Sequence, residues 1–136
     1  MVYLTRRERF SASHRLYNDN WSLEQNESVF GKCSNEFFHG HNFQLFVTVK
    51  GKPDADTGFF VNAHELSQII KKQVVDRVDH KNINMQVDFM KDIIPSCENF
   101  VMQIWKQINP HLPEGCILHS IKLIETENIY VEYFGE

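Results

Sequence analysis

The chain has 136 residues, of which 42% are hydrophobic and 24% are charged, and its formal net charge is −4. This length predicts a single domain over residues 1–136, and the composition excludes a disordered chain. The acidic balance argues against a nucleic-acid partner, and the lack of a long apolar run argues against a membrane protein. Three cysteines without a signal-peptide pattern indicate free thiols, so we expect a cytoplasmic protein.

The first half of the chain predicts two long strands. In residues 2–16, apolar or small side chains and His14 recur at every second position, although the charged run RRER weakens the pattern. Residues 18–30 are polar and irregular, which predicts a loop. Residues 39–50 alternate regularly, and one face of this strand carries His39, His41, Phe43, Leu45, Val47 and Val49.

The second half predicts two helices followed by two strands. Asn62 can cap a helix that extends to Val78, and residues 79–89 look irregular. A second helix begins at Ser96, after Pro95, and ends near residue 108. Strands follow over residues 117–125 and 129–134. The order ββααββ predicts an α+β fold, with a mostly antiparallel four-stranded sheet and both helices on one face.

His39 and His41 are candidates for metal ligands. Side chains two residues apart in a strand point to the same face, and Gly40 between them permits a close approach to the backbone. Two imidazoles fit a zinc ion, which takes three protein ligands in a catalytic site. His14 is the third candidate if the first two strands pair. The spacing alone leaves open the alternative that these histidines are packed or solvated.

Two further sets of residues are candidates for proton transfer. Asp79 precedes His80 in the irregular stretch after the first helix, and a nearby carboxylate can orient an imidazole. Cys33 lies six residues before His39, and a thiol becomes a useful base when a metal or cation lowers its pKa. Each pattern is weak alone, because a solvated Asp-His pair or a small core cysteine explains it equally well.

These fragments together, in this order, resemble one family. FSASHRL, FGKC, C-x5-H-G-H-N, DHKNIN, an EN pair near the second helix start and ETEN follow one another from about residue 7 to residue 136. This arrangement is similar to that of the 6-pyruvoyltetrahydropterin synthase family. Phe43 departs from the family pattern, which often has tyrosine there, and Ser96-Cys97 stands where a threonine pair is common.

The resemblance implies a lyase of tetrahydrobiopterin biosynthesis. The family converts 7,8-dihydroneopterin triphosphate, a small molecule, to 6-pyruvoyltetrahydropterin and releases triphosphate. Its zinc ligands match His14, His39 and His41, and its catalytic residues match Cys33, Asp79 and His80. Its pterin-anchoring glutamate matches Glu125, and further substrate-binding positions match Glu98, Ser96 and Cys97.

The resemblance also implies an assembly. Family members have the tunnelling fold, in which three subunits close their sheets into a barrel and two trimers form a homohexamer. Active sites lie between subunits. The triphosphate needs cations, for which Arg15, Lys32 and Lys81 are candidates beside the motifs.

Two alternative functions stay open from the sequence. One is 6-carboxytetrahydropterin synthase, a relative that uses the same zinc triad and substrate. Five residues separate Cys33 from His39, and this long gap favours the pyruvoyl enzyme. The other is a non-catalytic scaffold that binds zinc or pterin, against which the joint presence of Cys33, Asp79 and His80 argues.

Overall fold

A five-stranded sheet in the order β3-β1-β2-β4-β5 organises the chain in the computed structural model, which describes residues 1–136. Its strands are β1 (Val2–His14), β2 (His39–Gly51), β3 (Lys81–Asn82), β4 (Ile117–Thr126) and β5 (Ile129–Tyr133). The four longer strands β1, β2, β4 and β5 pair with one another in antiparallel fashion, as predicted, which confirms the α+β fold class. The two-residue strand β3 was not predicted. It pairs in parallel with Ala12 and Ser13, and it is too short to carry a sequence pattern.

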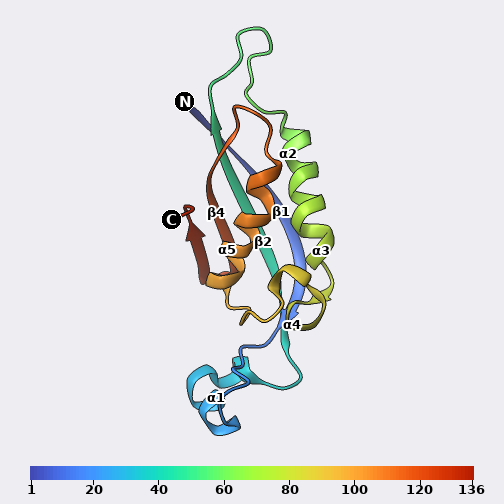
Figure 1. Cartoon of the computed structure of the whole chain (residues 1–136), viewed down its shortest axis with the longest axis vertical. Coiled ribbons are helices and arrows are strands. Elements are labelled where there is room, and N and C mark those ends of the chain that lie inside the picture. Colours follow the sequence, from blue (N-terminus) through green and yellow to red (C-terminus); the bar gives the residue numbers. More distant parts are fainter.

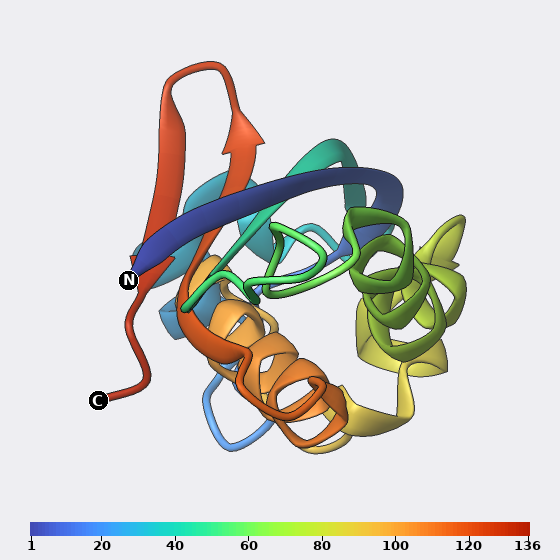
Figure 2. The same cartoon turned by 90° about the horizontal axis from the view of Figure 1, so that it is seen from above.

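Two long helical rods pack on the same face of the sheet (Figures 1 and 2). The first consists of α2 (Ala63–Ile70), a π-helical segment (Lys71–Val75) and α3 (Asp76–Val78), and the second is α5 (Cys97–Ile108). The side chains of Asn62 and Ser96 accept hydrogen bonds from the first turns of α2 and α5. Both predicted helix starts are therefore confirmed.

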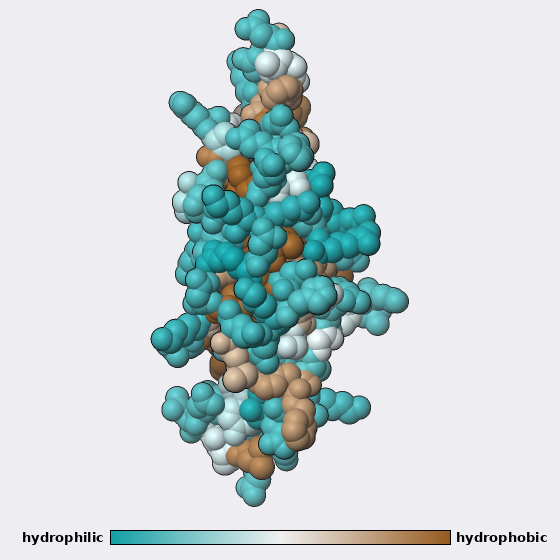
Figure 3. Space-filling view, turned by 90° about the vertical axis from the view of Figure 1, so that its right-hand side faces the viewer, coloured by the Kyte–Doolittle hydropathy of each residue, from teal (hydrophilic) through white to brown (hydrophobic).

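The hydrophobic core lies between the two helical segments and the face of the sheet that they cover. Alternate residues of the long strands point into it. In β2, Phe43, Leu45, Val47 and Val49 are all at most 1% exposed, which confirms the predicted buried face. Hydrophilic residues dominate the face of the molecule drawn in Figure 3, and hydrophobic residues are visible between them. No helix combines the length and the apolar character needed to span a bilayer.

The prediction of a loop over residues 18–30 is wrong. The segment contains α1 (Leu23–Phe30) and is followed by a 3-10 turn (Gly31–Ser34), and both lie beyond the ends of the long strands (Figure 1). Asn26 is the one buried residue of α1, and its side chain bonds to the backbone N–H and C=O of Asn18. A polar residue therefore holds this helix in place, so no apolar periodicity marks it in the sequence.

Residues 79–89 are more regular than predicted. After β3 come α4 (Ile83–Gln86) and a 3-10 turn (Asp88–Met90). The side chain of Asn82 caps α4 by accepting a hydrogen bond from Met85 N–H. These elements are each a single turn or less, so they are shorter than the window in which helical periodicity can be recognised.

Candidate active site and metal centre

Three histidines converge at one end of the sheet. His14 and His39 face each other across the β1–β2 pair, and His41 follows two residues along β2. One ring nitrogen from each histidine and a carboxylate oxygen of Glu125 all lie within 4.8 Å of one another. The ring nitrogens His14 Nε2, His39 Nδ1 and His41 Nε2 are buried and make no hydrogen bond.

Buried ring nitrogens without partners are costly unless a ligand satisfies them. Three convergent imidazole nitrogens are the ligand set that suits a zinc ion with one open coordination position. The residues present therefore fit a metal. The structure brings together all three histidines that the sequence singled out as ligands.

His14 is oriented by a contact outside the cluster. Its Nδ1 lies 2.8 Å from the carbonyl oxygen of Pro95, the residue just before the Ser96 cap of α5. A carbonyl only accepts, so Nδ1 carries the proton and Nε2 presents its lone pair to the cluster. This arrangement, a metal-binding imidazole held by a second-sphere acceptor, is common at metal sites. The role of Pro95 has no signal in the sequence.

Burial lowers the pKa of all three histidines below the ordinary value. Burial is the largest cause in each case, and a neighbouring histidine adds to it at all three residues. Glu125 opposes the shift at each of them, and the Pro95 carbonyl opposes it at His14. The rings are accordingly neutral at physiological pH, which is the state in which imidazole binds metals.

Glu125 enters the cluster from β4. It continues the alternation of the buried residues Ile121 and Leu123, so it faces the same side as the histidines. The β4–β5 register shifts between Ile124 and Thr126, and such irregularities often redirect a side chain near a site. Its Oε1 lies 2.9 Å from His41 Nε2, in an orientation that makes no hydrogen bond.

Two further residues, Phe43 and Gly40, shape the surroundings of the histidine cluster. The Phe43 ring packs against the rings of His14 and His41 and is 1% exposed, so no hydroxyl is needed at this position. At Gly40, an added Cβ would lie 3.3 Å from the carbonyl oxygen of Ala12. The glycine between the two histidines therefore lets β2 approach β1 closely, as its position predicted.

Asp79 and His80 are hydrogen-bonded to Ser11, on the edge of β1 that faces away from β2. Ser11 N–H donates to Asp79 Oδ1 at 2.9 Å, and His80 N–H donates to Ser11 O at 2.6 Å. His80 has a φ of 59°, which is rare for a residue with a side chain, and its Nδ1 lies 3.0 Å from Asp79 Oδ1. The Ser11 N–H is the main reason why the pKa of Asp79 is lowered, so this carboxylate is ionised and can orient the ring.

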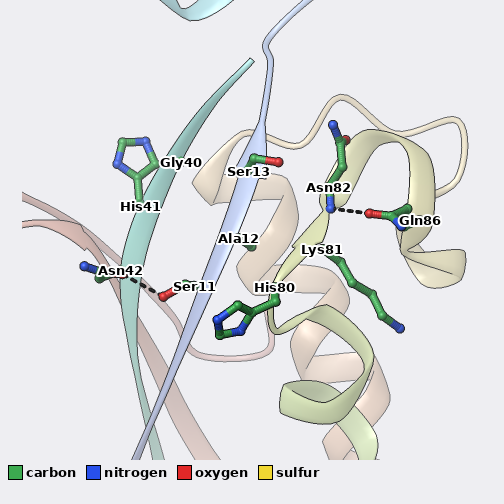
Figure 4. A pocket seen from close by; sticks show the side chains of 10 residues that line it. All are labelled: Ser11, Ala12, Ser13, Gly40, His41, Asn42, His80, Lys81, Asn82 and Gln86. Atoms are coloured by element: carbon green, nitrogen blue, oxygen red, sulfur yellow. Dashed lines mark hydrogen bonds between the residues drawn. The ribbon is translucent and has the colours of Figure 1, made fainter. Parts of the chain in front are cut away.

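Asp79 and His80 do not join the histidine cluster within one chain. His80, whose side chain is 82% exposed, lines an open cleft with Ser11, Ser13 and Asn42, and the same cleft reaches Gly40 and His41 on β2. The strand residues Ser11, Ser13 and Asn42 have the opposite parity to His14 and His41, so their side chains lie on the other face of the sheet. In Figure 4 the His80 ring lies beside Ser11, whereas the His41 ring lies apart on β2.

Cys33 lies in the 3-10 turn after α1 and is half-buried. Two bonds join this turn to the end of β1: Leu16 N–H donates to Cys33 O at 2.8 Å, and Arg15 Nε donates to Ser34 O at 3.0 Å. Asn84 in turn binds both the N–H and the C=O of Arg15. The cysteine turn is thus anchored one or two residues after His14, although the thiol itself bonds to none of the cluster residues.

The remaining predicted residues lie around the start of α5. Cys97 is buried and its thiol donates to Glu125 Oε2, while Glu98 is exposed in the first turn. The hydroxyl of Ser96 is occupied as the helix cap, where it accepts from Asn99 N–H. Of the three basic candidates, Lys81 lines the cleft with His80, Arg15 stacks on Tyr17 and Lys32 is exposed.

The chain is similar over its whole length to one group of known proteins. The family model described as 6-pyruvoyl tetrahydropterin synthase matches residues 3–136. The 6-pyruvoyl tetrahydrobiopterin synthase of Dictyostelium discoideum is 47% identical, over 99% of this chain and 97% of that protein. The human 6-pyruvoyl tetrahydrobiopterin synthase is 41% identical, over 98% and 91%. The structure of Caenorhabditis elegans 6-pyruvoyl tetrahydropterin synthase superimposes with a TM-score of 0.93 at 30% identity, covering 99% of this chain and 96% of that one.

Proposed function

The chain belongs to the 6-pyruvoyl tetrahydropterin synthase family, and from this premise we propose the reaction that it catalyses. It is a lyase that converts 7,8-dihydroneopterin triphosphate to 6-pyruvoyltetrahydropterin, with release of triphosphate, in tetrahydrobiopterin biosynthesis in the cytoplasm. The observation that carries the proposal is the convergence of three unpartnered histidine nitrogens beside Glu125. This arrangement offers a metal site and a pterin anchor next to each other.

We assign the metal ligands to His14, His39 and His41, and the metal to zinc. Zinc bound there supplies Lewis-acid chemistry, which makes protons on carbons next to its oxygen ligands more acidic. Three histidines would hold the zinc and would leave one coordination position for the substrate. Glu125 faces the same space, and its carboxylate can accept two hydrogen bonds from the N–H groups of a pterin ring.

We assign the proton transfers to Cys33 and to the Asp79–His80 pair. Cys33, as a thiolate, takes a proton from the substrate side chain, and its turn is anchored beside the end of β1 that carries His14. Asp79 is ionised and orients the imidazole of His80, which moves a proton at the second position. Ser96 and Glu98, at the start of α5, border the pterin, and Cys97 lies beside them against Glu125.

The complete site requires a second copy of the chain. The cleft that His80 lines also reaches His41, but the His80 ring lies beside Ser11, whose side chain is on the face of the sheet opposite the histidine cluster, and we infer that one chain does not present both to one substrate. β1 is also unpaired along most of one side, since β3 covers only Ala12 and Ser13. Such an edge favours association through strands. We therefore propose a homohexamer, a dimer of trimers with closed barrels, in which a neighbouring subunit contributes Asp79 and His80.

Product analysis tests this function directly. The purified, zinc-loaded protein is incubated with 7,8-dihydroneopterin triphosphate, and the pterin product, triphosphate and acetaldehyde are measured. The proposal expects triphosphate with a 6-pyruvoyl product. Acetaldehyde with a 6-carboxy product would identify the carboxy enzyme instead, and no release of triphosphate would indicate a binding scaffold.

A further inference from the structure

The thiol of Cys97 makes a contact for which the proposed reaction has no direct use. Cys97 is the first residue of α5, is 5% exposed, and its Sγ donates to Oε2 of Glu125. Burial, and then the adjacent Glu125 carboxylate, raise its pKa. The thiol is therefore protonated at physiological pH and has a proton to donate.

This hydrogen bond fixes one side of the Glu125 carboxylate. Oε2 faces Cys97 on α5, and Oε1 faces His41 on β2. The Cys97 thiol is the one hydrogen-bond donor to Oε2 in the structure. A glutamate side chain has three rotatable bonds, so the loss of this donor frees the carboxylate to turn.

We propose that Cys97 is a positioning residue, whose S–H group holds Glu125 with Oε1 directed at the histidine cluster and the pterin. Cys97 acts on the substrate only through Glu125, and this part of the inference rests on the proposed function. It differs from the direct substrate contact expected from the sequence. A serine or threonine hydroxyl supplies the same donor, which explains how a cysteine is accommodated at a position where threonine is common.

Two other roles for Cys97 do not fit its surroundings. It is not one of the four residues whose ligand atoms cluster within 4.8 Å, so it is not placed as a metal ligand. It is also buried and protonated, whereas a nucleophilic cysteine needs an accessible thiolate. Donation to Glu125 is the role that its contacts support.

Infrared spectroscopy of the S–H stretch tests the hydrogen bond without reference to activity. The bands of the zinc-loaded protein are assigned with the single variants Cys33→Ser, Cys97→Ser and Cys116→Ser. A strong S–H hydrogen bond lowers the stretching frequency, so we expect the Cys97 band at the lowest wavenumber. In Glu125→Ala this band should move up, while the band of the buried Cys116 stays in place. A Cys97 band that does not respond to Glu125→Ala overturns the proposal.

Kinetics then test the positioning role. In Cys97→Ala we expect the KM for the pterin substrate to rise about tenfold, as for loss of a charge-assisted hydrogen bond. Zinc content should stay unchanged, Cys97→Ser should restore the KM, and the matched control Cys116→Ala should leave it unaltered. A Cys97→Ser variant as impaired as Cys97→Ala overturns the role. If the unmodified protein releases no triphosphate, the proposed function fails, and the infrared result still decides on the hydrogen bond.

Discussion

At the scale of single residues, the proposed metal site depends on ring nitrogens that have no other partner. His39 is partly exposed and contributes Nδ1, whereas His14 is 2% exposed and packs against the core. Replacing His39 therefore tests metal binding with the least damage to the fold. We expect His39→Ala to lose most of its zinc and activity while its circular dichroism spectrum is retained. Stoichiometric zinc in this variant, measured by atomic absorption, would exclude His39 as a ligand.

Cys33 is expected to act as a base and not as a ligand, because three histidines already fill the protein positions of a catalytic zinc. Cys33→Ser keeps the size of the side chain but replaces the thiol with a much weaker acid. Turnover should fall by a factor on the order of 10²–10⁴, the usual range for losing a general base. Zinc content and pterin affinity, measured on the same sample, should be retained. Loss of zinc together with activity would show that Cys33 is a ligand.

The lowered pKa values of His14, His39 and His41 predict how the metal-free protein responds to acid. The unfolded chain protonates these rings near the ordinary pKa of 6.5, and the folded chain protonates them only at lower pH. Below pH 6.5 the unfolded state thus binds more protons, so the free energy of unfolding falls as the pH falls. Urea denaturation between pH 7.5 and pH 5 measures this slope. His39→Ala should reduce it, and a flat slope in the unmodified protein would contradict the shifts.

At the scale of elements, α1 depends on one buried polar side chain. Asn26 is 0% exposed and holds the helix to Asn18, and the Cys33 turn follows directly. Asn26→Ala leaves a backbone N–H without its partner and should cost about 1–3 kcal/mol of local stability. Hydrogen exchange should therefore accelerate in residues 18–34, with lower turnover and unchanged zinc. Equal acceleration in β2 would show that the effect is global.

At the scale of the whole molecule, the opposite faces of the sheet predict that two chains share each site. Cys33→Ser and His80→Ala should each be inactive alone. Co-refolded in equal amounts, they should recover about one quarter of the sites, because a random mixture places both intact residues at a quarter of the interfaces. Light scattering should give the mass of a hexamer. A mixture that stays inactive while it forms mixed hexamers would place both residues in the same chain's site.

The sequence by itself determined the features that depend on local periodicity. Alternation predicted the long strands and the buried face of β2, and the Asn62 cap and the proline before Ser96 predicted the two helix starts. Because strand parity fixes which side chains are neighbours, the shared face of His39 and His41 followed from their spacing alone. The order of the motifs indicated the family that the comparisons confirm.

Only the tertiary structure decided what depends on distant contacts. Three such contacts are the Pro95 carbonyl that orients His14, the Cys97 thiol that holds Glu125 and the Asn26 side chain that holds α1. Each is one partner of a hydrogen bond. The other partner of the hydrogen bond is a side chain elsewhere in the sequence or a backbone group, and backbone groups are the same in every residue. A polar side chain has no periodic signature, and its partner is set by how the elements pack. For the same reason, the sequence did not show that Asp79 and His80 lie outside the cluster of His14, His39 and His41. Strand pairing decides which of these residues lie together.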